Sequence, residues 1–159
     1  MSETTFKVDK EKLEVTIERV FAAPRERIWK VLTDPAAIPQ WWGPGFLTTI
    51  VDKMEVRVGG GWRFLQRDPE GGEYAFNGEY REVKEAERIV QTFVYEAYPD
   101  SVMVETMTLE ELPDGRTRLR GKSVFPSIEA LEGMVIADME KGAIESWERL
   151  AELLAKVSA

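Results

Sequence analysis

Most of this chain is a series of short alternating segments separated by turns. Apolar and polar residues alternate within each of them, over 46–57, 62–67, 74–83, 88–96, 102–111 and 116–123. A period of two predicts strands. Strands joined by short turns are antiparallel neighbours, because parallel neighbours need a crossover of about a dozen or more residues. A further alternating segment lies over 13–21, so we expect one antiparallel sheet of about seven strands.

The segments around this series have helical patterns. After 13–21, Pro24 stands where proline suits a first helical turn, and two short helices are expected to end near Trp41. From Ser127, an expected N-cap, a long helix extends to Lys156, with a break expected between Gly133 and Asp138. Its apolar residues recur every three or four positions and form one stripe: Ile136, Met139, Ala143, Trp147, Leu150 and Leu154.

The order of these elements predicts the fold class. A sheet must bury one face, and the C-terminal helix is the only expected element large enough to cover it. We therefore expect an α+β fold in which a curved antiparallel sheet wraps on the long C-terminal helix, with two short helices after the first strand. The space between such layers is a usual place for a small molecule to bind.

The length of the chain suits a single domain. A chain of 159 residues buries about 70% of the surface that its unfolded form exposes, so one core is sufficient. We expect an N-terminal tail over 1–12 and one domain over 13–157. The first residues carry alternating charges and no apolar run, so we expect no signal peptide, no membrane insertion and a cytoplasmic location.

The composition excludes several kinds of chemistry. The sequence contains no histidine and no cysteine, which excludes histidine-dependent triads, thiol catalysis and zinc fingers. No carboxylate cluster suggests a metal site, and we expect no cofactor. The 29 acidic side chains outnumber the 21 basic ones, for a net charge of −8. Because proteins bind nucleic acid by neutralising its phosphates, we expect no nucleic-acid partner.

Several short motifs occur in the order found in a known family. They are Phe21-Ala22-Ala23-Pro24 with Trp29, Asp34-Pro35, Trp41-Trp42-Gly43-Pro44, Arg57-Val58-Gly59-Gly60 leading to Trp62, Phe125-Pro126-Ser127, Met139-Glu140-Lys141-Gly142 and Glu145-Ser146-Trp147-Glu148-Arg149-Leu150. Over roughly residues 13–156 the chain resembles the START-like SRPBCC superfamily. Within it, the chain resembles the AHSA-type branch, which is named for the activator of the ATPase of the ninety-kilodalton heat-shock protein.

This resemblance implies a helix-grip fold (START-like, Bet v-like) with a deep internal pocket. It implies less about activity, because the superfamily includes lipid and hormone carriers as well as polyketide cyclases, and a fold does not determine a function. The eukaryotic co-chaperones of the branch carry an additional N-terminal domain that contacts the chaperone. We expect no such domain within these 159 residues.

Alternation and helical spacing assign a set of side chains to the space between sheet and helix. Many are aromatic or Met, which suits an adaptable pocket for a flat or flexible apolar molecule; core packing alone would also place them there. Gln91, Leu109 and Leu119 are expected on the same face of the sheet. The expected ligand-binding residues are Trp42, Phe46, Trp62, Phe64, Phe76, Tyr80, Phe93, Tyr95, Met103, Glu105, Met107, Met139, Ala143 and Trp147.

Glu105 is the carboxylate among these positions, and it lies between Met103 and Met107. Burial disfavours a charged carboxylate and raises its pKa. Glu105 is therefore the candidate catalytic residue, as a general acid or base, or else an anchor for a hydroxyl or amine of a ligand. The alternatives are that it points into solvent at the mouth of the pocket, or that it pairs with a nearby Arg or Lys.

These observations favour a protein that binds a small hydrophobic molecule in an internal pocket, as a carrier or a sensor. One alternative is a cofactor-free enzyme of the polyketide cyclase type that uses Glu105. A further alternative is a co-chaperone-like protein-interaction module. The sequence is compatible with a monomer or a homodimer, and it leaves open whether any reaction is catalysed.

Overall fold

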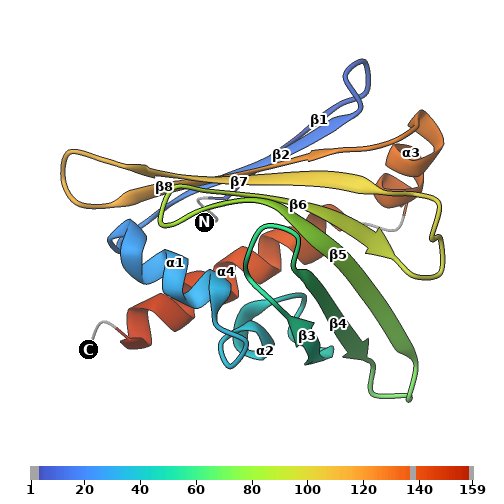
Figure 1. Ribbon diagram of the computed structural model, residues 1–159, viewed down its shortest axis with the longest axis horizontal. Coiled ribbons are helices and arrows are strands. Elements are labelled where there is room, and N and C mark those ends of the chain that lie inside the picture. Colours follow the sequence, from blue (N-terminus) through green and yellow to red (C-terminus); the bar gives the residue numbers. More distant parts are fainter. Residues whose placement is uncertain (1–3, 137–138, 158–159) are drawn as a thin grey trace.

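The strands form one antiparallel sheet that bends around a helix (Figure 1). The computed structural model describes residues 4–136 and 139–157. Within these ranges eight strands are paired in the order β1-β2-β8-β7-β6-β5-β4-β3. They are β1 (Thr5–Asp9), β2 (Glu14–Phe21), β3 (Thr48–Met54), β4 (Gly61–Arg67), β5 (Glu73–Lys84), β6 (Arg88–Tyr95), β7 (Met103–Glu111) and β8 (Thr117–Val124). The expected α+β class and antiparallel sheet are confirmed.

The strand count differs from the expected one because of β1. This strand lies in the segment that we expected to be an N-terminal tail, and it pairs with β2 from Thr5↔Glu18 to Asp9↔Glu14. It is an edge strand in which four of five residues are exposed. Phe6 and Val8 alternate with polar residues in this strand, a period of two that the expectation of a charged tail overlooked.

Four helices are described: α1 (Arg25–Thr33), α2 (Ile38–Trp41), α3 (Ile128–Ile136) and α4 (Met139–Val157). The Ser127 hydroxyl accepts a hydrogen bond from the Ala130 N–H at 3.1 Å, which confirms Ser127 as the N-cap of α3. The expected break in the C-terminal helix falls between α3 and α4. Residues 137–138, which join them, lie outside the described residues.

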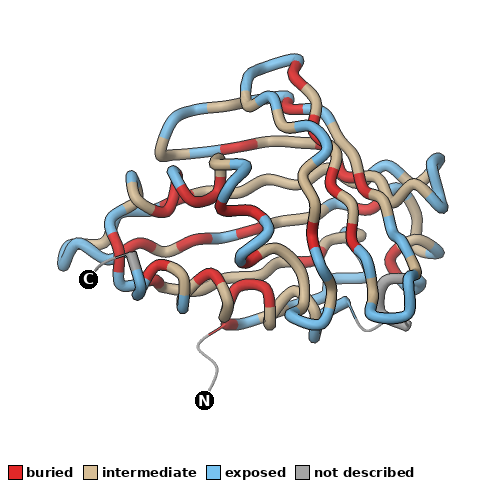
Figure 2. Tube along the Cα trace, turned by 90° about the horizontal axis from the view of Figure 1, so that it is seen from below, coloured by how far each residue is buried: buried red, intermediate tan, exposed pale blue. Residues whose placement is uncertain are grey.

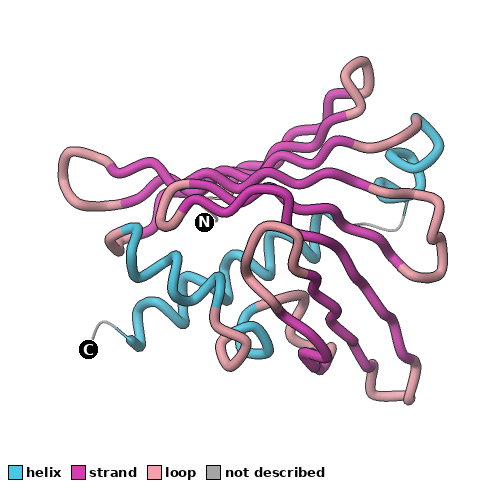
Figure 3. The backbone as a smooth tube through the Cα atoms, in the orientation of Figure 1, coloured by secondary structure: helices cyan, strands magenta, loops and turns pink. Residues whose placement is uncertain are grey.

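The helices α1, α2 and α4 lie on one side of the sheet, and α3 lies at one end (Figure 1). The strands β3, β4 and β5 bend away from the rest of the sheet toward the side of the helices (Figure 3), and β3 contacts α2. Buried segments lie mainly on the strands and helices, and exposed segments lie mainly in the connecting loops (Figure 2). The main core therefore forms between the concave face of the sheet and α1, α2 and α4.

Two irregularities accompany the bend of the sheet. The pairing register shifts between Val51 and Lys53 on β3 and between Tyr80 and Glu82 on β5, and such bulges bend the strand that carries them. Gly78 on β5 has a different role, because any side chain there would collide with the indole of Trp62. That indole donates a hydrogen bond to the Thr92 carbonyl oxygen at 3.2 Å.

Candidate functional site

The position of Gly121 shows which face of the sheet meets α4. A Cβ atom at Gly121 on β8 would lie 3.4 Å from the ring of Trp147 on α4. Ser123, two residues further along β8, therefore points to the same side. Strand pairing aligns Ser123 with Glu105, Glu105 with Gln91, and Gln91 with Tyr80. These four side chains form one row across the inner face, which we call the inner row.

The interior is filled unevenly along the strands. At one end lies a closed half, made of side chains that are at most 4% exposed: Phe21, Leu109, Leu119, Leu150 and Leu154. At the other end lies an accessible half, whose side chains are all partly exposed: Gln91, Met103, Glu105, Met107, Ser123 and Ala143. Met103 and Met107 both pack against the main core. The accessible half therefore belongs to the inner face and still has surface that another molecule can contact.

Glu105 lies in the middle of the accessible half and is held by neutral partners. The Gln91 amide donates to Oε1 at 3.2 Å, and the Ser123 hydroxyl donates to Oε2 at 3.4 Å. Burial raises the pKa of Glu105 to about 7, and these two hydrogen bonds oppose that rise. No ion pair within residues 4–136 and 139–157 includes Glu105. The alternative of a basic partner is therefore wrong, whereas the side chain of Glu105 does remain partly exposed.

A group of aromatic rings lies next to the accessible half. Met103 on β7 connects the two, because it pairs with Phe93 on β6. The ring centroid of Trp42 lies 5.1 Å from that of Phe64 and 5.5 Å from that of Phe76, and Phe76 stacks on Tyr95 at 5.2 Å. Trp42 and Tyr95 are partly exposed, whereas the Phe side chains are buried. The aromatic residues therefore extend the apolar lining from the core to accessible positions.

The loop that carries Trp42 is fastened to α4. The Ser146 hydroxyl accepts a hydrogen bond from the Gly43 N–H at 3.0 Å and donates one to the Trp41 carbonyl oxygen at 3.0 Å. Arg149 donates to the Gly43 carbonyl oxygen at 2.7 Å. The sequence interpretation missed Ser146 and Ser123. Spacing from Leu119 on β8 places Ser123 on the inner face, but no local pattern shows that a Ser of α4 will contact residues about a hundred positions earlier.

The expected site residues fall into three groups. Trp62, Phe64, Phe76, Tyr80, Phe93 and Trp147 are buried in the main core. Trp42, Tyr95, Met103, Glu105, Met107 and Ala143 are partly exposed.

The third group consists of Phe46 and Met139. Both were expected to face the interior, but their exposed fractions are 66% and 42%. Phe46 is exposed because β3 begins only at Thr48, which leaves Phe46 in the preceding loop. Met139 is the first residue of α4, ahead of the part that packs on the sheet.

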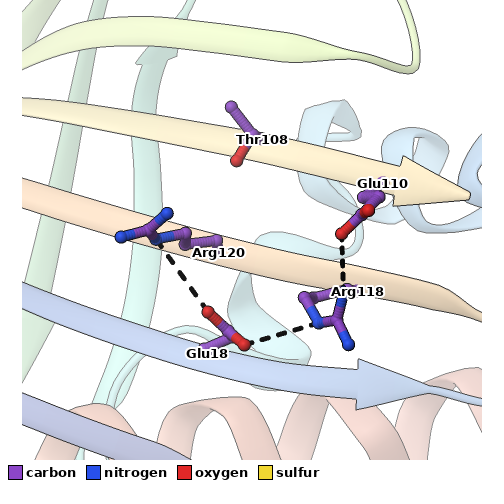
Figure 4. A pocket seen from close by; sticks show the side chains of 5 residues that line it. All are labelled: Glu18, Thr108, Glu110, Arg118 and Arg120. Carbon is purple, nitrogen blue, oxygen red and sulfur yellow. Dashed lines mark hydrogen bonds and ion pairs between the residues drawn. The ribbon is translucent and has the colours of Figure 1, made fainter.

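The outer face of the sheet carries a hollow of about 420 Å³ lined by Glu18, Thr108, Glu110, Arg118 and Arg120 (Figure 4). Its charges pair with one another. Arg118 contacts Glu110 at 2.7 Å and Glu18 at 3.4 Å, and Arg120 contacts Glu18 at 3.9 Å. These side chains are 39–62% exposed. The basic side chains of β8 thus belong to a solvated surface that is balanced by acidic neighbours, and we place no ligand there.

Within residues 4–136 and 139–157, no helix is both long enough and apolar enough to cross a membrane. These ranges also contain no group of three or more acidic side chains arranged to hold a metal ion.

Solved structures with the same fold are numerous, and three are informative. A crystal structure of a protein from Mycobacterium smegmatis is 29% identical, with a TM-score of 0.85, and the match covers 95% of this chain and 96% of that one. A solution structure of a protein from Arthrobacter aurescens is 25% identical, with a TM-score of 0.89, and covers 96% and 91%. DynU16, from the dynemicin biosynthetic locus, is 20% identical, with a TM-score of 0.70, and covers 90% and 47%.

The search of curated proteins found no match for the chain. A family model does match, over residues 22–158, and its description is "Activator of Hsp90 ATPase homolog 1-like protein". This match covers most of the sequence and includes the loop that carries Trp42, the inner row and α4. The chain therefore belongs to the Activator of Hsp90 ATPase homolog 1-like family, with the helix-grip fold of the START-like SRPBCC superfamily.

Proposed function

We propose that this protein binds a small hydrophobic molecule in the accessible half of its interior, between β6, β7, β8 and α4. The observation that carries the proposal is the uneven filling of one continuous inner face. Close packing is the rule for protein interiors, yet Met103, Met107 and Ala143 keep exposed surface where sheet and helix face each other. Apolar surface of this kind, inside a concave fold, is the usual setting for a ligand.

The lining residues suit a flat or flexible molecule. Met side chains adapt their shape to a ligand, and the partly exposed rings of Trp42 and Tyr95 offer faces for stacking. No single charged group dominates this lining, because its carboxylate is held by the neutral side chains of Gln91 and Ser123. We therefore infer that apolar contact supplies most of the binding free energy.

A fluorescence titration with N-phenyl-1-naphthylamine, a neutral dye that brightens in apolar surroundings, tests the proposal. Ala143 lies four residues before Trp147 and so shares its face of α4. Ala143→Phe should fill the accessible half and weaken dye binding by about ten-fold or more. The matched control is Ala155→Phe, because Ala155 lies on the same helix and is exposed.

Wild-type protein should bind the dye with one site per chain, and the control variant should bind it equally well. Absence of dye binding to the wild-type protein would refute the proposal. Equal weakening in both variants would do so as well, since the site would then lie outside the space that Ala143 adjoins.

A second candidate function is catalysis without a cofactor, and the environment of Glu105 favours it. A carboxyl group whose pKa is raised to about 7 can give or take a proton near neutral pH. For an enzyme that uses Glu105 in this way, Glu105→Gln should abolish turnover and preserve substrate binding. Unchanged turnover would remove Glu105 from the mechanism.

The family description also suggests contact with a chaperone. The exposed large apolar side chains of the described residues come from β1, β5, β8, α4 and three connecting loops. Because they are not concentrated on one element, the surface gives this function less support than the interior gives to ligand binding.

A further inference from the structure

Glu105 occupies the centre of the inner row, where the rest of the accessible lining is neutral. Its neighbours along β7 on the inner face are Met103 and Met107, and its neighbours across the sheet are Gln91 and Ser123. The facing helix contributes Ala143 and the ring of Trp147. The hydrogen-bond partners of Glu105 are both neutral, and no ion pair within residues 4–136 and 139–157 includes it. A negative charge on this carboxyl group therefore has no paired counter-charge in those ranges.

The hydrogen bonds to Glu105 leave it incompletely satisfied. Each carboxylate oxygen receives one donor, at 3.2 Å and 3.4 Å, and both distances exceed the range of about 2.7–2.9 Å that is usual for bonds to a charged group. An ionised carboxylate offers roughly four acceptor positions. Glu105 can therefore accept further donors from the accessible side, where its own surface is partly exposed.

A cation supplied by a ligand would complete this arrangement. Burying a carboxylate without a counter-charge is unfavourable, and a paired, hydrogen-bonded cation offsets much of that cost. An ammonium group has donors to share, and the two Met side chains beside Glu105 can contact an attached apolar body. The net charge of −8 also favours the approach of a cation over that of an anion.

We propose that the ligand is an apolar amine whose ammonium group binds to Glu105 while its apolar part lies against Met103, Met107 and Trp147. This inference rests on the proposed binding function and specifies the chemical class of the ligand. In the complex the ammonium donates to the carboxylate oxygens, and Gln91 and Ser123 keep the carboxylate in place. Glu105 is a binding residue in this arrangement, and no covalent step is involved.

Four probes that share one naphthalene ring system separate the charge of the ligand from its apolar body. They are 1-(aminomethyl)naphthalene, 1-naphthalenemethanol, 1-methylnaphthalene and 1-naphthoic acid, and each is measured by displacement of N-phenyl-1-naphthylamine at about pH 8. The amine should bind at least about ten-fold more tightly than the methyl compound, and the acid should bind most weakly of the four. Glu105→Gln should remove the advantage of the amine over the methyl compound.

The matched control is Glu110→Gln, because Glu110 lies on the same strand but pairs with Arg118 on the outer face. This control should keep the full advantage of the amine. A measurement on the wild-type protein alone is also decisive. Lowering the pH to about 5.5 protonates Glu105 and should remove the advantage of the amine, which remains an ammonium ion at both pH values.

The outcomes distinguish the two proposals. Equal binding of all four probes, or an alcohol that binds as well as the amine, would overturn the assignment of an amine and leave the binding function standing. Failure of every probe to bind, together with failure of the dye, would overturn the binding function itself. Persistence of the advantage in Glu105→Gln would show that another group receives the ammonium.

Discussion

The two halves of the interior share the same strands and the same helix, but they differ in how completely side chains fill them. In the closed half, Leu119 and Leu150 have no exposed surface at all. In the accessible half, Met107 lies only two residues from Leu109 along β7 and is nevertheless partly exposed. One sheet thus carries both a packed core and a surface available to a ligand. Under the proposed function, stability and binding are assigned to different ends of the same strands.

The helices explain why one half closes. In the closed half a second helix, α1, packs beside α4 and contacts β7, and its Ile28 and Leu32 are at most 5% exposed. The part of α4 that faces this half contributes Leu150 and Leu154. At the accessible end, α4 contributes the small side chain of Ala143 instead. The helix α2 and the loop after it also contact α4, so the difference between the halves lies in the side chains that α4 presents, small in one half and large in the other.

Truncating one side chain in each half should affect stability very differently. Leu150→Ala should lower the free energy of unfolding by about 4 kcal/mol, because it leaves a cavity in a fully buried position. Met107→Ala should cost less than about half of that, since its side chain loses less buried surface. Urea unfolding of both variants measures the difference. Equal losses would mean that the accessible half is packed as completely as the closed half.

The next effect is a pH dependence that belongs to the accessible half. The pKa of Glu105 rises from 4.5 to about 7 on folding, so between these values the folded state binds more protons than the unfolded state. Glu105 therefore lowers the free energy of unfolding as the pH rises between these two values, by about 1.4 kcal/mol per pH unit. The total loss reaches about 3 kcal/mol above pH 7. Because Gln does not titrate, the stability of Glu105→Gln relative to wild type should increase by this amount.

Urea unfolding at several pH values gives this relative stability, which should be flat above about pH 7 and flat again below the unfolded pKa. Glu110→Gln, on the outer face of β7, provides the control for the loss of a carboxylate. A relative stability of Glu105→Gln that does not change with pH would show that Glu105 is hydrated as in the unfolded chain. The accessible half would then be open to bulk solvent.

The sequence predicts the fold well because the fold depends on local patterns. Alternation around Met103 and Met107 places Glu105 on the inner face, and the structure agrees. Helical spacing similarly identifies the buried face of α4 through Trp147, Leu150 and Leu154. Such patterns are repeated over many residues, so one irregular position does not hide them.

The details of the site were less predictable because they depend on contacts between distant segments. The partners of Glu105 are set by the register of β6 and β8 against β7, and alternation within one strand does not determine a register. Phe46 shows the same limit at a boundary, since a strand that begins two residues later than expected leaves its side chain exposed. Contacts that depend on strand register, or on where a strand or helix ends, can be assigned only once the sheet is assembled.

The smallest expected effect compares one buried hydroxyl from each half. Thr117 in the closed half donates to the Ala23 carbonyl oxygen at 2.8 Å, and Ser146 holds Gly43 and Trp41 beside the accessible half. Thr117→Val and Ser146→Ala should each cost about 1 kcal/mol, because each leaves buried backbone groups without a partner.

Their effects on ligand binding should differ, since only Ser146 fastens the loop that carries Trp42. Ser146→Ala should weaken the binding of N-phenyl-1-naphthylamine by about three-fold, and Thr117→Val should leave it unchanged. Titration of the two variants under conditions where both remain folded checks this. Equal loss of affinity in the two variants would show that dye binding depends on the stability of the whole protein. The closed half would then contribute to binding as much as the accessible half does.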